Sequence, residues 1–183
     1  MTQFNVPTRD QVSESNQVIF DQLKAALGFV PNLYATIAYS RNALGNYLQL
    51  QNAKTSLSKK EKEVINLVVS QVNACEYCLA AHTVIGKMNG FTDEQVLELR
   101  SGYASFNAKL DALAQLTKVI AENKGRLSDE TPLDAFFAAG YTQESLVDLI
   151  VVIADKIVMN YLHNLTKIPV DFPAAPALTA IEA

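Results

Sequence analysis

The chain of 183 residues carries a net charge of −4 and has about the length of one domain. Its hydrophobic fraction of 49% lies at the apolar end for a soluble protein. A core of that size needs neither a metal ion nor a disulfide to hold it together. The acidic balance and the absence of any Lys/Arg run longer than two residues argue against a nucleic-acid partner. The N-terminus shows no basic segment followed by an apolar run, and charges interrupt the most apolar stretch, 146–162. We therefore expect a cytoplasmic protein with no membrane span.

Apolar residues recur at helical spacing along nearly the whole chain, which predicts an all-α fold. Glycines, prolines and capping residues separate the segments. The last segment is the most apolar, and we expect it to be the central helix. Helices are predicted at 14–27, 31–39, 42–54, 59–72, 73–90, 92–100, 105–125, 132–139 and 142–165.

Four polar residues are expected to begin helices. Ser58 stands three residues before Glu61, and Thr92 three before Gln95, which is the spacing of a capping box. By the same pattern, Asn73 would cap the next helix with Glu76 at its third position. Ser105 would open the helix that Gly125 ends. The four residues are Ser58, Asn73, Thr92 and Ser105.

The domain organisation follows from the same pattern. We expect a single helical domain over 1–183, with an N-terminal extension at 1–13 and a Pro/Ala-rich C-terminal arm at 169–183. Pro173 and Pro176 prevent the arm from continuing the last helix. It is therefore either a disordered end or an arm that lies on a neighbouring subunit.

The segment "CEYCLAAH", 75–82, contains both cysteines and one of the two histidines of the chain. With a cap at Asn73, Cys75 falls in the first helical turn and Cys78 just beyond it. Positions 75, 78 and 82 then lie within an arc of roughly 60°. A helix start favours a thiolate, the His82 imidazole can accept its proton, and a second thiol can condense with a sulfenic acid. The spacing thus indicates a redox-active pair.

Two structural interpretations compete with a redox pair. A zinc site needs three or four protein ligands, and only His82 and His163 are available besides the two thiols. We therefore expect no metal and no other cofactor. Two buried, unreactive core cysteines are the other alternative, because free cysteine is among the most buried residue types.

The pattern Cys75-Glu76-Tyr77-Cys78, followed by three residues and His82, resembles the AhpD alkylhydroperoxidase and carboxymuconolactone decarboxylase superfamily, in its peroxidase-related branch. Two further segments, "GFVPNLYATIAYSRNAL" at 28–44 and "NYLHNLTKIPVDFP" at 160–173, extend the similarity over most of the chain. The family pattern has a glutamate twelve residues before the first cysteine, where this chain has Glu63. The resemblance implies a compact multi-helix AhpD-like domain with its CxxC motif at a helix N-terminus.

The resemblance also implies residue roles and partners. Cys78 would be the peroxidatic nucleophile and Cys75 the resolving cysteine, with His82 and Glu63 as a proton relay. The activity would be a thiol-dependent peroxidase that reduces hydrogen peroxide or organic hydroperoxides through a Cys75–Cys78 disulfide. An external dithiol, thioredoxin-like or lipoyl-bearing, would supply the electrons. The family further implies a homo-oligomer, as a dimer, trimer or hexamer, which the apolar composition supports.

Several alternatives remain open from the sequence. The chain could be a non-enzymatic redox sensor or interaction module, or an enzyme of the carboxymuconolactone decarboxylase type, although that branch does not use a cysteine pair. By spacing alone, Glu61 is as plausible a buried carboxylate as Glu63. Tyr77 stands where well-known alkylhydroperoxidases have a histidine, so one possible base is missing. His163 is expected to be a hydrogen-bonded core or interface group with a possible catalytic role, and Asp155 to be structural if it pairs with a cation.

Overall fold

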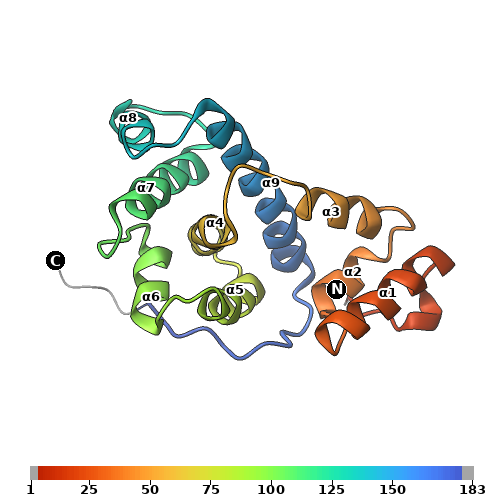
Figure 1. Ribbon diagram of the computed structural model, residues 1–183. Helices are drawn as coiled ribbons and strands as arrows, with labels where there is room; N and C mark the ends of the chain where they lie inside the picture. Colours follow the sequence, from red (N-terminus) through yellow and green to blue (C-terminus); the bar gives the residue numbers. More distant parts are fainter. Residues whose placement is uncertain (1–3, 179–183) are drawn as a thin grey trace.

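The computed structural model describes residues 4–178, so residues 1–3 of the expected N-terminal extension and 179–183 of the expected arm lie outside the described residues. The described chain contains helices and no strand, which confirms the all-α prediction (Figure 1). The elements are η1 (Arg9–Gln11), α1 (Glu14–Leu27), α2 (Asn32–Ile37), α3 (Ala43–Gln51), α4 (Lys59–Val72), α5 (Glu76–Met88), α6 (Asp93–Ser101), α7 (Ala108–Asn123), α8 (Thr131–Ala138) and α9 (Gln143–Thr166).

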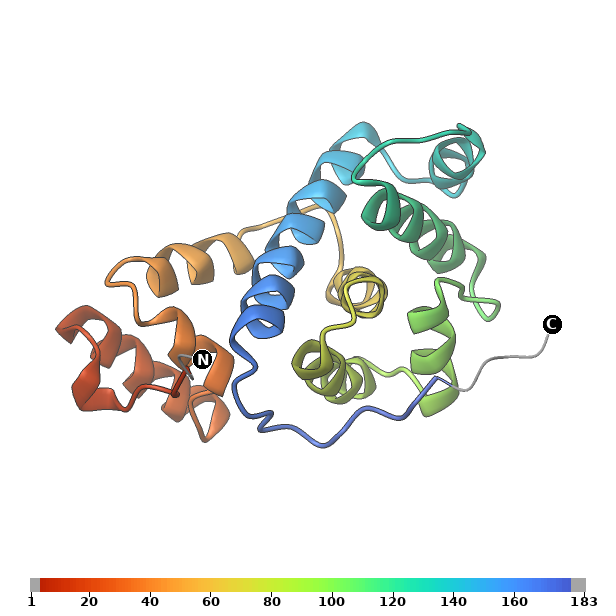
Figure 2. The ribbon, with the colours of Figure 1, turned by 180° about the vertical axis from the view of Figure 1, so that it is seen from behind.

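Helix α4 is the centre of the fold. It contacts α5, α6, α7 and α9, which surround it in both views (Figures 1 and 2). All of its residues from 63 to 70 are buried. The expectation that the last helix is central was wrong, because α9 leaves one apolar face exposed to solvent while α4 is enclosed. The hydrophobic content of a helix reports its average burial, and it does not report how many neighbours surround it.

Two clusters of buried apolar side chains make up the core. The larger lies between α4, α6, α7, α8 and the first half of α9. The smaller joins α1, α2 and α3 to the beginning of α5 and the end of α9, and it contains Cys75, Tyr77 and Cys78. The cysteine motif thus lies where the N-terminal helices meet the helical body around α4.

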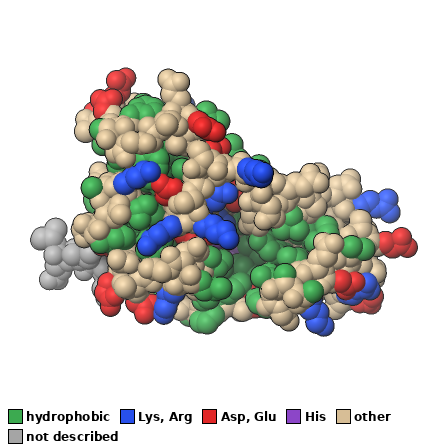
Figure 3. All heavy atoms as spheres, viewed as in Figure 1, with side chains coloured by type: hydrophobic (Ala, Val, Ile, Leu, Met, Phe, Trp, Pro, Cys, Tyr) green, Lys and Arg blue, Asp and Glu red, His purple; other side chains and the backbone are tan. Residues whose placement is uncertain are grey.

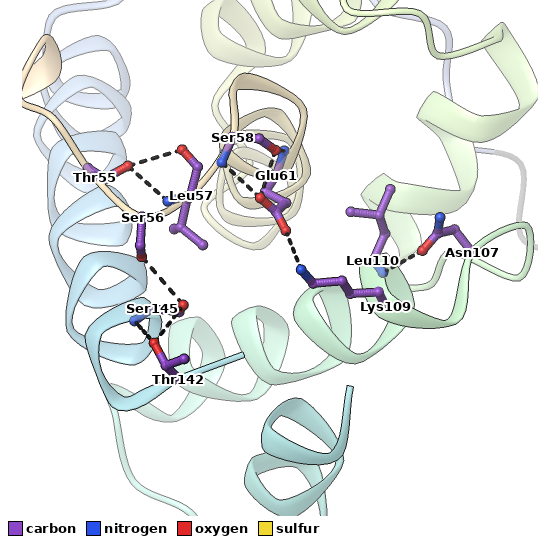
Figure 4. Close-up of polar contacts among 10 residues, drawn as sticks. All are labelled: Thr55, Ser56, Leu57, Ser58, Glu61, Asn107, Lys109, Leu110, Thr142 and Ser145. Atoms are coloured by element: carbon purple, nitrogen blue, oxygen red, sulfur yellow. Dashed lines mark hydrogen bonds and ion pairs between the residues drawn. The ribbon is translucent and has the colours of Figure 1, made fainter. Parts of the chain in front are cut away.

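The predicted side-chain caps form at the starts of α4 (Figure 4) and α6, but not at the starts of α5 and α7. Ser58 Oγ accepts the Glu61 N–H at 3.2 Å, and the Glu61 carboxylate accepts the Ser58 N–H at 2.8 Å, so the predicted capping box is formed. Thr92 and Gln95 form the equivalent box on α6. The α7 prediction was wrong by two residues, because Asn107 Oδ1, and not Ser105, accepts the Leu110 N–H at 3.0 Å.

The C-terminal segment runs across α5 towards α6 of its own chain (Figures 1 and 2). Arg100 Nη1 donates to the Pro176 carbonyl at 2.6 Å. The Asn32 N–H donates to the Asp171 carboxylate at 2.7 Å, and Asn32 Nδ2 donates to the Pro169 carbonyl at 3.1 Å. The described part of the arm is therefore held on the same chain. None of the helices between residues 4 and 178 has the length and hydrophobicity needed to cross a membrane.

The α7 cap gives a matched test of the fold. We expect Asn107→Ala to lower the free energy of unfolding by about 1 kcal/mol, because the cap hydrogen bond to Leu110 is lost. Ser105→Ala should change it by less than about 0.5 kcal/mol, because Ser105 does not cap the helix. Urea denaturation of both variants measures the difference, and equal losses would contradict the observed helix start.

Candidate active site

Cys75 itself begins helix α5. Its extended backbone makes it the N-cap, and its Sγ accepts the Cys78 N–H at 3.3 Å. The expectation that Asn73 caps this helix was wrong, because Asn73 ends α4. Ala74 between them adopts a left-handed conformation with φ +48°, which is unfavourable for a residue with a Cβ, and the Cys75 N–H donates to the Ser70 carbonyl at 3.0 Å. The prediction of a CxxC motif at a helix N-terminus is confirmed.

The two thiols are free and buried, and they are not equivalent. A hydrogen bond from Cys78 lowers the pKa of the Cys75 thiol to about 5, against the opposing effect of burial, and His163 and the Cys78 N–H lower it further. The same hydrogen bond to Cys75 raises the pKa of the Cys78 thiol, and burial adds to that rise. The hydrogen bond between the two thiols thus favours the thiolate on Cys75 and the protonated thiol on Cys78.

A buried acid–base pair lies next to the thiols. His82 Nδ1 and Glu63 Oε2 are 2.8 Å apart, and each residue is less than a tenth exposed. Glu63 Oε1 also accepts from Asn66 Nδ2 at 2.9 Å. Burial acts to raise the pKa of Glu63, but the nearby His82, Lys156 and Asn66 outweigh it and hold that pKa below its usual value. Glu63 of α4 is thus a buried carboxylate that contacts the His82 imidazole. His82 in turn lies one helical turn after Cys78 on α5.

The alternative carboxylate, Glu61, has a different place. Its Oε2 accepts from Ser58 at the start of α4, and its Oε1 lies 3.4 Å from Lys109 Nζ of α7 (Figure 4). Hydrogen bonds from Ser58 counter the effect of burial and lower the pKa of Glu61. Glu61 therefore caps the helix and lies away from the cysteines.

His163 and Tyr77 lie on the Cys75 side of the motif. The His163 ring is 2% exposed, its Nε2 donates to the Ile168 carbonyl at 3.3 Å, and the ring lowers the pKa of the nearby Cys75 thiol. The Tyr77 ring packs 5.4 Å from the His163 ring, and the Tyr77 hydroxyl accepts the Leu33 N–H at 3.3 Å. Burial raises the pKa of Tyr77. Tyr77 therefore joins α5 to α2 and does not offer a base.

Sequence reasoning missed two residues of α9 that belong to this cluster, Lys156 and Asn160. Asn160 is fully buried, donates to Ser70 Oγ at 3.3 Å and lowers the pKa of the nearby Cys78 thiol. Lys156 is 2% exposed, and its charge also lowers the pKa of Cys78. The sequence did contain a signal for them, because Lys156 and Asn160 are polar and four residues apart within the most apolar helix. That spacing places both side chains on one face of the helix.

Asp155 lacks the cationic partner that a structural role was expected to require. It is 8% exposed and makes no salt bridge within the described residues. Instead, burial raises the pKa of the Tyr47 phenol of α3, and the nearby Asp155 carboxylate raises it further. Gln51 connects Tyr47 to Tyr34 by hydrogen bonds of 2.9 and 2.7 Å, so these groups form a polar chain beside the thiol site.

A cavity of about 480 Å³ lies between α5, α6 and the C-terminal segment, and Glu76, Leu79, Ala80 and Arg100 contribute to its lining. These α5 positions face roughly the opposite side of the helix from Cys78 and His82. The cavity is therefore not where the thiols react. Figure 3 shows a hollow on another part of the surface, lined by hydrophobic side chains, between the regions over α5 and α2. Within residues 4–178, no group of three or more His, Cys, Asp or Glu side chains could hold a metal ion.

Comparison with known proteins agrees with this architecture. Residues 40–119, which include α4 and α5, match the model of the carboxymuconolactone decarboxylase family. No protein of curated function matches the sequence significantly. Among solved structures, an AhpD-core, peroxidase-related protein from Ralstonia eutropha JMP134 has a TM-score of 0.79 at 20% identity, covering 89% of this chain and 88% of its own.

Two further structures share the fold. A peroxidase-related protein from Silicibacter sp. TM1040 has a TM-score of 0.78 at 22% identity, covering 90% of this chain and 88% of its own. The debrominase Bmp8, solved with 2,3,4-tribromopyrrole, has a TM-score of 0.70 at 16% identity, covering 87% of this chain and 89% of its own. The chain thus has an AhpD-like fold, and its residues 40–119 are similar to the carboxymuconolactone decarboxylase family.

Proposed function

We propose that the chain is a thiol-dependent peroxidase that reduces hydrogen peroxide or organic hydroperoxides through a Cys75–Cys78 disulfide. The observation that carries this proposal is the pair of free thiols at the start of α5 beside the hydrogen-bonded Glu63–His82 pair. Such a site can provide a sulfur nucleophile, a proton relay and a second sulfur within reach.

In the first step, the Cys78 sulfur attacks the terminal oxygen of the hydroperoxide. An S–O bond forms and the O–O bond breaks. The proton of the Cys78 thiol passes through His82 to the leaving alkoxide, which departs as an alcohol, or as water from hydrogen peroxide. Glu63 holds the His82 ring by the 2.8 Å contact to Nδ1, which leaves the other ring nitrogen to move the proton.

In the second step, the Cys75 thiolate attacks the sulfur of the Cys78 sulfenic acid. The S–S bond forms, the S–O bond breaks, and hydroxide leaves and takes a proton from solvent. The lowered pKa of Cys75 suits this resolving role, because its sulfur is already an anion when the sulfenic acid appears. An external dithiol, thioredoxin-like or lipoyl-bearing, then returns two electrons and two protons.

The shared fold does not choose the reaction, since a debrominase has it too. Decarboxylase-type chemistry and a redox sensor without turnover remain the competing proposals. The first would not require the cysteines, and the second would form the disulfide without sustained consumption of peroxide. The cysteine variants described below separate all three.

Assembly into a homo-oligomer is part of the proposal. The exposed face of α9 carries apolar side chains at helical spacing and no charge between residues 147 and 165. An exposed apolar stripe of this length is typical of a surface that another chain covers. Its large members are Val147, Ile150, Val158, Tyr161 and Leu165.

The two cysteine variants test the order of events. After one equivalent of peroxide, Cys75→Ser should accumulate a sulfenic acid on Cys78 that dimedone traps, whereas Cys78→Ser should trap little at Cys75. The unsubstituted chain should lose two hydrogens, as mass spectrometry measures, and should consume peroxide continuously when a dithiol is present. Trapping mainly on Cys75 would reverse the two roles, and disulfide formation without turnover would favour the sensor.

The charge of the pair can be titrated directly. Because the pKa of Cys75 is lowered to about 5, the ultraviolet absorbance of one thiolate should appear in the reduced chain as the pH rises through about 5. Cys78→Ser removes the sulfhydryl donor that is the largest cause of this shift, so the midpoint should move up towards the usual value of about 8.5. If the unsubstituted chain showed a single titration midpoint near that usual value, Cys75 would not be a thiolate at neutral pH and the proposed resolving step would lose its basis.

The relay is tested by two carboxylates of the same helix. Glu63→Gln should reduce peroxide turnover about a hundredfold, because the His82 ring loses its anionic partner, while the melting temperature stays close to that of the unsubstituted chain. Glu61→Gln should retain turnover, since Glu61 caps α4 and glutamine also serves in a capping box. Equal turnover in the two variants would exclude Glu63 from the relay.

A further inference from the structure

Lys156 is a buried cation to which the reaction described above assigns no role. It lies in the middle of α9 and is 2% exposed. Within residues 4–178, none of the salt bridges includes it. A lysine side chain without an ion pair is unfavourable in the interior unless its charge meets an anion that the fold creates.

The register between α4 and α9 shows which groups Lys156 faces. Ser56 of the loop before α4 donates to Asp148 at 2.7 Å, and Ser70 accepts from Asn160 at 3.3 Å. The two helices therefore run side by side in the same direction, with each α4 position level with the α9 position about ninety residues later. Lys156 accordingly lies level with the turn of α4 that contains Glu63 and Asn66.

The same face of α9 reaches the thiols. Asn160 is one turn after Lys156, donates to Ser70 Oγ of α4 and lowers the pKa of the Cys78 thiol of α5. Side chains at i and i+4 of a helix are neighbours, so Lys156 and Asn160 meet the same surface of α4 and α5. Lys156 thus lies on the face of α9 that is turned towards Glu63 and Cys78, and its charge acts on both.

We propose that Lys156 is a positioning residue of the thiol site, whose ammonium group stabilises the anionic forms of Cys78 and Glu63 together. This proposal rests on the proposed function for its catalytic meaning. When the proton leaves Cys78, the site carries negative charge on Cys75, Cys78 and Glu63 at once. A buried cation between the helices opposes that accumulation, because charges attract strongly where water is excluded.

The electrostatics support this placement. The charge of Lys156 lowers the pKa of Glu63 and that of Cys78, in each case against the effect of burial. Other titratable groups also face the site from the helices packed around it. They are Tyr34 of α2, Tyr47 of α3, Cys75 before α5, Tyr77 and His82 of α5, and Asp155 and His163 of α9.

The test measures Cys78 ionisation in Cys75→Ser, where the other thiol no longer raises it. In that background, we expect Lys156→Met to move the pH midpoint of Cys78 alkylation by iodoacetamide upwards by about one to three units. Lys156→Arg keeps the charge and should restore most of the shift. In the chain with both cysteines, Lys156→Met should lower kcat for peroxide about tenfold or more with a smaller change in KM.

The matched control is Lys62→Met, which also removes one positive charge, but from the α4 residue that precedes Glu63 in the sequence. Lys62 is partly exposed and its Nζ lies 3.5 Å from the Ala53 carbonyl, so solvent screens its charge and the midpoint should stay near that of the parent. An unchanged midpoint in folded Lys156→Met, or a shift of the same size in Lys62→Met, would overturn the proposal.

If Lys156→Met does not fold, Lys156→Gln replaces it. A second measurement, which needs no substitution at Lys156, tests the same proposal. The nitrogen chemical shift of its ammonium group in Cys75→Ser should change at the pH at which Cys78 ionises, and independence from that titration would also overturn the proposal. Failure of the proposed function would look different, because peroxide turnover would be absent while the ionisation of Cys78 still depended on Lys156.

Discussion

The packing of α9 along α4 is the constraint on which the site depends. Side-chain hydrogen bonds fix the register of the two helices at both ends, through Asp148 near the start of α9 and through Asn160 and Asn164 near its end. With that register, Lys156 is level with Glu63, and His163 is beside Cys75. Helix α9 also belongs to both apolar clusters, which favours one domain rather than two. A shift of one turn would separate every one of these groups.

The start of α5 then makes two similar cysteines chemically different. Cys75 is the cap and accepts hydrogen bonds, so its anion is stabilised, while Cys78 donates to it and keeps its proton. In the proposed reaction, the first thiol resolves a sulfenic acid and the second needs a relay before it reacts. His82, paired with Glu63, lies one helical turn along α5 from that second thiol, and the charge of Lys156 lowers its pKa. These side chains are all buried, and hydrogen bonds and ion pairs are stronger where water is largely excluded.

Much of the fold could be predicted because helices and their ends are local. Periodic apolar residues identified every α-helix, and the capping boxes at Ser58 and Thr92 formed as expected. Errors arose where two polar residues competed for one helix start. Asn107 caps α7 in place of Ser105, and Cys75 caps α5 in place of Asn73. The spacing of capping residues allows both choices, and contacts between helices select one of them.

For the site, the sequence by itself determined that Cys75, Cys78 and His82 share one face of a helix, because that follows from helical geometry alone. The family spacing pointed to Glu63, which periodicity could not separate from Glu61. The capping box at Ser58 already gave Glu61 a role, but only the tertiary structure decided that Glu63 meets His82. It also decided that Lys156 lies near Glu63, from a helix about ninety residues later. Side chains within a turn are placed by the backbone that carries them, whereas partners on distant helices are placed by packing, which no local pattern contains.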